Sequence, residues 1–228
     1  MTSTLKLAVI VATKDRSKLL AERSLPSIKH QTKTPDFLLV CDDSSIGGRE
    51  ENRKIVQQVK IANCAVHYLN NKRTPGASGC WNSAVDFLLS LIVLPERVVI
   101  AFLDDDDEWQ PSYLQQCLST MEHHNVEMVA CGINRIENNT KEPLKSLAPN
   151  TLTTSSFLIG NPGIQGSNLF LRLSTFLQAG GFDESLASAT DRDFCIRLTE
   201  LRSVNYRALS QYLVNHYAEA DRSRLSTY

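Results

Sequence analysis

The sequence lacks the features that mark several common classes of protein. No two of its six cysteines form a CxxC pair, which argues against a structural zinc site. Its longest apolar stretch, FLLSLIVL, falls well short of the ~20 residues that span a bilayer. The formal net charge is −1 and the basic residues are scattered along the chain. We therefore expect no nucleic-acid partner and no strong attraction to an acidic membrane surface.

Other absences bear on location and on domain organisation. The apolar run at residues 5–11 is too short for a secretory leader and merges into a strand pattern. The missing leader and the cysteines within apolar runs predict a reducing, cytoplasmic location. The chain has no internal repeat and no linker rich in proline or glycine. We therefore expect its 228 residues, 42% of them apolar, to form a single domain, 1–228.

Short apolar strands alternate with amphipathic helices in the first half of the chain. The apolar spacing predicts strands at residues 5–12, 36–43, 65–70, 97–103 and 126–133. Between them it predicts helices at 17–30, 50–61, 78–94 and 111–124. This alternation is typical of an α/β fold with a parallel, doubly wound sheet.

The second half has a different character. Residues 135–165 are polar and rich in turn formers, which predicts a long loop or hairpin. A strand is expected at 166–173, and a short helix at 175–184 that Gly180 and Gly181 close. A further helix is predicted at 191–201, followed by one or two strands within 204–217.

The segment VVIAFLDDDDEWQP has an apolar run that stops at four aspartates, Asp104–Asp107. Two carboxylates about 5 Å apart repel by roughly 3 kcal/mol at an effective dielectric constant of about 20. Such a cluster relaxes by protonation, by solvation or by binding a cation. One interpretation is a solvated turn that caps the next helix. Its position after a buried strand, where open α/β sheets bind ligands, favours a magnesium or manganese site beside phosphate oxygens.

Further carboxylates occur where they could join the same site. Asp42 and Asp43 end another predicted strand, and parallel strands end at the same edge of a sheet. Asp191 and Asp193 open a late helix, where aspartate also serves as an ordinary N-terminal cap. The residues alone leave both interpretations of this last pair open.

Six segments, in order, resemble those of glycosyltransferase family 2, whose members have the GT-A fold. The segments are VIVATKDR, LVCDDSS, RTPGASGCWNSAVD, FLDDDDEWQP, GSNLFLRLSTFLQAGGFDESL and TDRDFCIRL. The resemblance covers nearly the whole chain. It implies a GT-A-like, Rossmann-like and mostly parallel sheet flanked by helices, with a smaller acceptor-side subregion. Residues 1–107 would form the nucleotide-sugar-binding half, and 108–228 the half that binds the acceptor and carries the catalytic base.

The resemblance also implies an activity. Family members of this kind transfer a sugar, with inversion, from a nucleoside diphosphate donor, here expected to be a UDP-sugar. The acceptor would be a glycan or glycolipid in polysaccharide synthesis, and the cofactor Mn²⁺ or Mg²⁺. A lipid-linked acceptor would bring the protein to the inner face of the membrane as a peripheral partner.

Residue by residue, the resemblance assigns nucleotide-sugar contacts to Thr13, Arg16, Asp43, Arg73, Asp104 and Asp105. Asp43 is expected to hydrogen-bond the nucleobase, and Arg73 to approach the donor phosphate. Gly166 and Ser167 are expected to line the acceptor pocket.

The metal and the base are assigned in the same way. Asp104 and Asp106 match the two acids of the DxD motif that holds the metal, and Asp107 is expected to support the turn or contact the sugar. Asp191 matches the catalytic base. His216 is a candidate third metal ligand, with an ordinary histidine at a strand end as the alternative.

Three positions depart from the usual family pattern. Lys14 stands where a tyrosine is common, Trp81 replaces a common arginine, and Thr190 replaces the glutamate before the expected base.

Two other functions remain open from the sequence. A sugar-phosphate nucleotidyltransferase also joins a Rossmann-like sheet to metal-binding aspartates, although the first strand–helix turn lacks a glycine-rich signature with lysine. A non-catalytic nucleotide-sugar-binding module is the other alternative, against which the presence of Asp191 argues.

Overall fold

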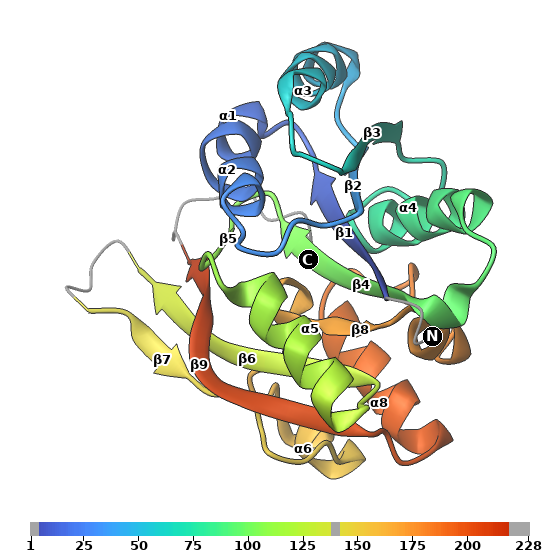
Figure 1. Cartoon of the computed structure of the whole chain (residues 1–228), viewed down its shortest axis with the longest axis vertical. Coiled ribbons are helices and arrows are strands. Elements are labelled where there is room, and N and C mark those ends of the chain that lie inside the picture. The colour runs from blue at the N-terminus through green and yellow to red at the C-terminus, as the bar shows by residue number, and fades with distance from the viewer. Residues whose placement is uncertain (1–4, 138–141, 219–228) are drawn as a thin grey trace.

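The computed structural model describes residues 5–137 and 142–218 of the chain. In this part of the chain one nine-stranded sheet forms the centre, with helices against both faces (Figure 1). The strands are β1 (Lys6–Thr13), β2 (Phe37–Asp42), β3 (Ala65–Asn70), β4 (Val98–Asp104), β5 (Glu108–Trp109), β6 (Met128–Ile136), β7 (Leu144–Ser146), β8 (Phe170–Arg172) and β9 (Tyr206–Tyr217).

Helices and helical turns connect these strands. The longer helices are α3 (Ile46–Gln58), α4 (Ala77–Leu91), α5 (Tyr113–His124) and α8 (Thr190–Leu201). The shorter ones are α1 (Ser17–Leu19), α2 (Leu25–Lys29), α6 (Thr154–Ile159) and α7 (Leu173–Gln178). A π turn, η1 (Leu20–Ser24), joins α1 to α2, and two 3₁₀ turns are η2 (Pro95–Arg97) and η3 (Gly166–Asn168).

The sheet order is β3-β2-β1-β4-β8-β6-β9-β5, and β7 pairs with β6. Strands β1 to β4 are parallel, as the alternation of strands and helices predicts. The short strand β8 runs antiparallel between β4 and β6. Strand β9 then pairs with β6 and, at its end, with β5, so that Asn215 lies opposite Glu108. Strands from both halves of the sequence thus meet at the segment after β4.

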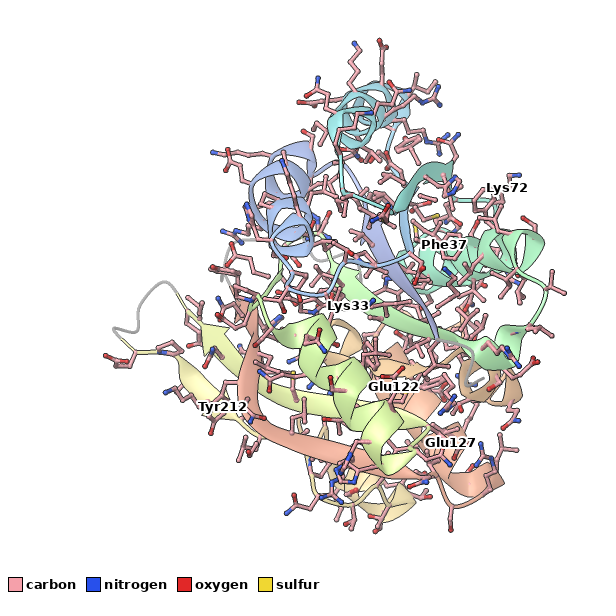
Figure 2. All side chains as sticks on the ribbon, in the orientation of Figure 1. Lys33, Phe37, Lys72, Glu122, Glu127 and Tyr212 are labelled. Atoms are coloured by element: carbon pink, nitrogen blue, oxygen red, sulfur yellow. The ribbon has the colours of Figure 1, made fainter. Side chains whose placement is uncertain are left out.

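Side chains on successive residues of β1 enter two different cores. Leu7, Val9 and Val11 pack with residues of η1, α2, α3 and α5 on one face of the sheet. Ala8 and Ile10 pack with residues of α4, α7 and α8 on the other face. All five side chains are fully buried, and burial of a large apolar side chain contributes about 1.5–3 kcal/mol. Figure 2 shows side chains filling the space between the sheet and the helices.

The structure confirms the predicted α/β class and corrects some elements. The helix expected at 50–61 begins at Ile46, since Gly47 and Gly48 are tolerated in its first turn. The segment expected to be a loop or hairpin, 135–165, contains β7 and also α6, a helix that the turn-rich composition concealed. The Thr153 hydroxyl accepts a hydrogen bond from the N–H of Ser156 and so caps α6.

The turn before α4 packs closely against Gly79, the third residue of that helix. A Cβ at Gly79 would overlap the carbonyl oxygen of Thr74. This oxygen belongs to the backbone, so it cannot move aside as the end of a flexible side chain could. The start of α4 and the loop before it are therefore packed as closely as a glycine allows.

We expect Gly79→Ala to lower the free energy of unfolding by about 2–3 kcal/mol, because the loop must shift to relieve the overlap. Chemical denaturation would measure this change. Gly47→Ala is the control, since a Cβ there meets nothing within 4 Å. It should leave stability unchanged or raise it by up to about 1 kcal/mol. Equal effects of the two substitutions would contradict the close packing at Gly79.

Candidate active site

The acidic segment forms a tight turn between β4 and β5. Asp104 is the last residue of β4, and the N–H of Asp107 donates to its carbonyl oxygen at 3.2 Å. The side chains of Asp105, Asp106 and Asp107 are buried, which rules out the solvated turn that the sequence left open. Buried carboxylates require compensation by hydrogen bonds, by cations or by protonation.

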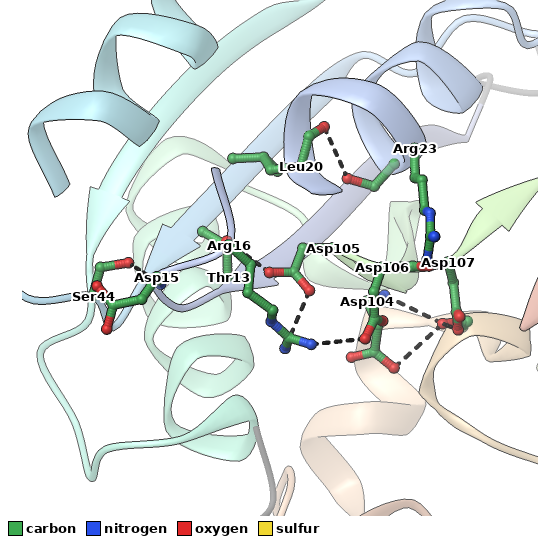
Figure 3. Close-up of polar contacts among 12 residues, drawn as sticks. Thr13, Asp15, Arg16, Leu20, Arg23, Ser44, Asp104, Asp105, Asp106 and Asp107 are labelled. Atoms are coloured by element: carbon green, nitrogen blue, oxygen red, sulfur yellow. Dashed lines mark hydrogen bonds and ion pairs between the residues drawn. The ribbon is translucent and has the colours of Figure 1, made fainter. Parts of the chain in front are cut away.

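Two residues at the end of β1 compensate part of this charge (Figure 3). The Thr13 hydroxyl donates to Asp105 at 2.8 Å. The Arg16 guanidinium reaches Asp106 at 2.7 Å and Asp105 at 3.2 Å. Burial raises the pKa of Asp105 to about 7, although the charge of Arg16 acts in the opposite direction. Thr13 and Arg16, expected to meet the nucleotide, are thus bonded to the acidic turn in this structure.

Three carboxylates of the turn form a set that fits a divalent cation. Asp104, Asp106 and Asp107 each have an oxygen within 4.8 Å of an oxygen of the other two. Burial raises the pKa of Asp104 well above its usual range, and repulsion from Asp106 and Asp107 raises it further. Carboxylate oxygens are the ligands that Mg²⁺ and Mn²⁺ prefer. The set includes the two expected ligands, Asp104 and Asp106, and adds Asp107, which we expected only to support the turn or contact the sugar.

His216 reaches this turn because β9 pairs with β5. Its Nδ1 lies 3.1 and 3.2 Å from the two carboxylate oxygens of Asp107. Burial opposes protonation of this imidazole, but the hydrogen bond and charge of Asp107 outweigh it and raise the pKa of His216. His216 therefore contacts one member of the carboxylate set, and its role as a metal ligand stays a prediction.

Ser167 is a second contact to the same carboxylates. Its hydroxyl donates to Asp107 at 2.6 Å and accepts from the N–H of Asp104 at 3.2 Å. The Trp109 indole N–H donates to the Ser167 carbonyl oxygen at 2.7 Å. The sequence pointed to Ser167 only as lining of an acceptor pocket. The hydrogen bond from Ser167 to Asp107 forms because β8 pairs with β4. Local sequence patterns do not reveal this pairing.

The two aspartates that end β2 differ in their surroundings. Asp42 is fully buried and accepts hydrogen bonds from Asn52, from Tyr68 and from the N–H of Ser44. These bonds give Asp42 a structural role.

Asp43 lies where two loops meet. It accepts from Asn71 and from the N–H of Gly76, both at 3.0 Å, and pairs with Lys14 at 3.2 Å. The structure thus places the residue expected to bind the nucleobase between the β1–α1 turn and the turn before α4.

Asp191 lies in the first turn of α8. Its carboxylate accepts a hydrogen bond from the N–H of Arg192 at 2.7 Å, as a residue near a helix N-terminus does. Burial raises the pKa of Asp191, while the charge of His216 lowers it. The role of Asp191 as catalytic base stays a prediction.

Arg73 is bonded elsewhere. Its guanidinium pairs with Asp86 at 2.6 Å and with Glu184 at 2.8 Å. Both carboxylates lie outside the acidic turn, and its expected contact with donor phosphate stays a prediction.

A cavity of about 250 Å³ lies between the turn before α4 and the segment that leads to α8. Its lining includes Gly76, Ser78, Glu184, Leu186 and Thr190. The cavity has room for a small ligand, and Thr190 in its lining is the residue before the expected base, Asp191.

The family model for glycosyl transferase family 2 matches residues 8–178, and the chain belongs to this family. The fold agrees with those of solved glycosyltransferases. One is S. aureus TarS 1–349 in complex with UDP-GlcNAc, with a TM-score of 0.73 and 21% identity over 98% of this chain and 61% of that one. Another is the Pyrobaculum calidifontis mannosyltransferase PcManGT in complex with GDP-Man and Mn²⁺, with a TM-score of 0.64 and 17% identity over 94% and 57%.

The chain spans about three fifths of the length of these two structures. No curated protein matches it. Among the described residues, none of the helices combines the length and apolar character needed to cross a bilayer.

We expect Arg16→Met to lower the free energy of unfolding by about 3 kcal/mol, because it removes the guanidinium that pairs with the buried carboxylates of Asp105 and Asp106. Mn²⁺ should recover more stability in this variant than in the wild type, since it replaces the missing positive charge. Thermal unfolding with and without Mn²⁺ measures both effects. Arg53→Met removes an exposed arginine that lies over the Tyr68 ring and serves as the control. The same Mn²⁺ effect in wild type and Arg16→Met would contradict this account of the turn.

Proposed function

We propose that this protein transfers a sugar, with inversion, from a nucleoside diphosphate donor to an acceptor hydroxyl. The observation that carries the proposal is the set of Asp104, Asp106 and Asp107, the last two of them buried, at the carboxyl end of β4 in a chain of glycosyl transferase family 2. Ligands of open α/β sheets bind at this edge. The expected donor is a UDP-sugar.

The three carboxylates are the residues that would hold a divalent cation, Mn²⁺ or Mg²⁺. When bound, the cation supplies positive charge close to the negative charge that develops on a diphosphate leaving group. The polypeptide supports this arrangement through Ser167 and His216, which fix the Asp107 carboxylate. Thr13 and Arg16 hold the intervening Asp105 from the other side.

Asp191 is the proposed general base. A carboxylate in the ionised form accepts the proton of the acceptor hydroxyl as the oxygen attacks the anomeric carbon. The bond to the donor phosphate breaks on the opposite face, so one displacement inverts the anomeric centre. Burial and the raised pKa of Asp191 suit a group that must take up a proton during the reaction.

The nucleotide is proposed to lie against Asp43, with Lys14 beside it. The structural relatives named above contain UDP-GlcNAc in one case and GDP-Man in the other. Both nucleotide sugars are therefore the donors to test first. For the acceptor we propose a glycan or glycolipid of polysaccharide synthesis. A cytoplasmic location, at the inner face of the membrane for a lipid-linked acceptor, belongs to the same proposal.

Release of nucleoside diphosphate from UDP-GlcNAc and from GDP-Man in the presence of Mn²⁺ tests the reaction without knowledge of the acceptor, because water can replace it. NMR spectroscopy of the released sugar, recorded before mutarotation, tests inversion. Turnover of a sugar 1-phosphate with a nucleoside triphosphate would instead favour the nucleotidyltransferase. Binding of a donor without any turnover would favour the non-catalytic module.

We expect Asp191→Asn to lower kcat by about 10²–10⁴-fold, since that is the usual contribution of a general base. In the wild type the rate should fall as the pH drops through the raised pKa of Asp191, and this dependence should be absent from the variant. Initial rates of donor turnover across pH measure both. Asp193→Asn, in the same helical turn but paired with Arg197, is the control and should retain the pH profile.

The raised pKa of Asp191 also predicts how Asp191→Asn changes the stability of the protein. Because folding raises the pKa of Asp191, ionisation of this carboxyl costs stability above that pKa, and stability is regained as the pH falls through it. Asparagine removes the charge and keeps a side-chain oxygen that can accept the hydrogen bond from the N–H of Arg192. Asp191→Asn should therefore be as stable at pH 7 as the wild type or more so. A large loss of stability would mean that Asp191 has mainly a structural role.

A further inference from the structure

The carboxylate of Glu184 joins two loops that are far apart in the sequence. One oxygen accepts hydrogen bonds from Arg73 and from Asn82, both at 2.8 Å. The other oxygen accepts from the backbone N–H of Thr74 at 3.0 Å. Glu184 belongs to the segment before α8, whereas Arg73 and Thr74 belong to the turn before α4. The carboxylate thus ties one segment to the other.

Asn82, in the second turn of α4, reinforces this connection. Its amide accepts from the N–H of Phe182 at 3.1 Å and donates to the carbonyl oxygen of Phe182 at 2.8 Å. Asn82 is buried, and so is the Phe182 ring, which packs against Trp81. The stretch from Phe182 to Glu184 is therefore held through the backbone of Phe182 and through the side chain of Glu184.

On the other side, the turn before α4 is bonded to the expected nucleobase residue. Asn71 donates to Asp43 and to the carbonyl oxygen of Thr74, both at 3.0 Å. The N–H of Gly76 donates to the second oxygen of Asp43 at 3.0 Å. A continuous set of hydrogen bonds therefore runs from Asp43 through Thr74 to Glu184.

Between Glu184 and the expected base the chain has little other support. Residues 186–190 make no side-chain hydrogen bond within the described structure. Ala189 has a positive φ of 59° and starts α8. Ser185 is bonded only to its neighbour Asp183. Glu184 is thus the nearest anchor on the N-terminal side of Asp191.

We propose that Glu184 is a positioning residue that couples the donor-binding turn before α4 to the general base Asp191. This inference rests on the proposed function, because it assumes a donor at Asp43 and a base at Asp191. It also gives Arg73 a role in the link. Displacement of Asp191 by even about 1 Å can cost up to about 100-fold in rate.

The charge of Glu184 is part of the link. Burial opposes its ionisation, but the hydrogen bonds from Asn82, Arg73 and Thr74 outweigh burial and lower the pKa of this carboxyl. The paired guanidinium of Arg73 is held in turn by Asp86. A glutamine at this position keeps the acceptor oxygen and the length of the side chain but loses the charge.

Hydrogen–deuterium exchange tests the link directly. In the full-length wild type, UDP or GDP with Mn²⁺ should slow exchange in peptides that cover 71–79 and also in those that cover 182–192. In Glu184→Ala the nucleotide should protect only 71–79. Asp183→Asn, which removes a carboxylate bonded only to Ser185, is the matched control and should behave as the wild type. Equal protection of 182–192 in Glu184→Ala would overturn the inference.

Kinetics separate positioning from a merely structural role. With UDP-GlcNAc or GDP-Man as donor, Glu184→Ala should lower kcat by about 10- to 100-fold with little change in donor KM. Glu184→Gln should recover part of the loss. Adding Arg73→Met to Glu184→Ala should cost little more, since both remove the same link. A loss of stability without a change in kcat, or a full additional loss on removing Arg73, would contradict the proposal.

Failure of this inference can be distinguished from failure of the proposed function. If nucleotides with Mn²⁺ protect 71–79 but never 182–192, the donor site stands and the coupling is wrong. If no nucleotide protects either segment or is turned over, the proposed function fails and the coupling fails with it.

Discussion

The compensation of negative charge in the turn after β4 is the constraint on which the rest of the site depends. Asp104, Asp106 and Asp107 hold oxygens within 4.8 Å of one another. At that separation two ionised carboxylates repel by about 3.5 kcal/mol at an effective dielectric constant of about 20. The Arg16 guanidinium pairs with Asp106 and with Asp105, which lies outside this set, and the Arg23 guanidinium donates to the carbonyl oxygen of Asp106 at 3.3 Å. A divalent cation bound between these carboxylates would reduce their mutual repulsion.

The sheet brings the compensating groups to this turn from distant parts of the sequence. Because β1 pairs with β4, Thr13 at the end of β1 and Arg16 just after it lie beside the turn. Because β8 pairs with β4, Ser167, which precedes β8, also lies beside it. The final strand, β9, pairs with β5 and delivers His216. An antiparallel strand within an otherwise parallel region thus lets the second half of the chain complete a site that the first half begins.

Much of this architecture could be predicted from the sequence, because its signals are local. Apolar runs that end in aspartates fixed the position of β2 and β4, and the spacing of apolar residues located most helices. The contacts of Ser167 and Glu184 could not be predicted, since they depend on which strands and loops become neighbours. The same holds for Asp107, whose membership of the carboxylate set follows from the tight turn. Helix α6 was missed because its sequence is dominated by serine, threonine and other weak helix formers.

The most direct test of the central claim is thermal unfolding of the wild type and Asp106→Ala with UDP, GDP, ADP and CDP, each with and without Mn²⁺. The account predicts that one nucleotide stabilises the wild type only when Mn²⁺ is present, by about 2.7 kcal/mol at a hundred times its dissociation constant. Asp106→Ala should lose this stabilisation. A nucleotide that stabilises both proteins equally, or none that stabilises the wild type, would contradict a metal-diphosphate site at this turn.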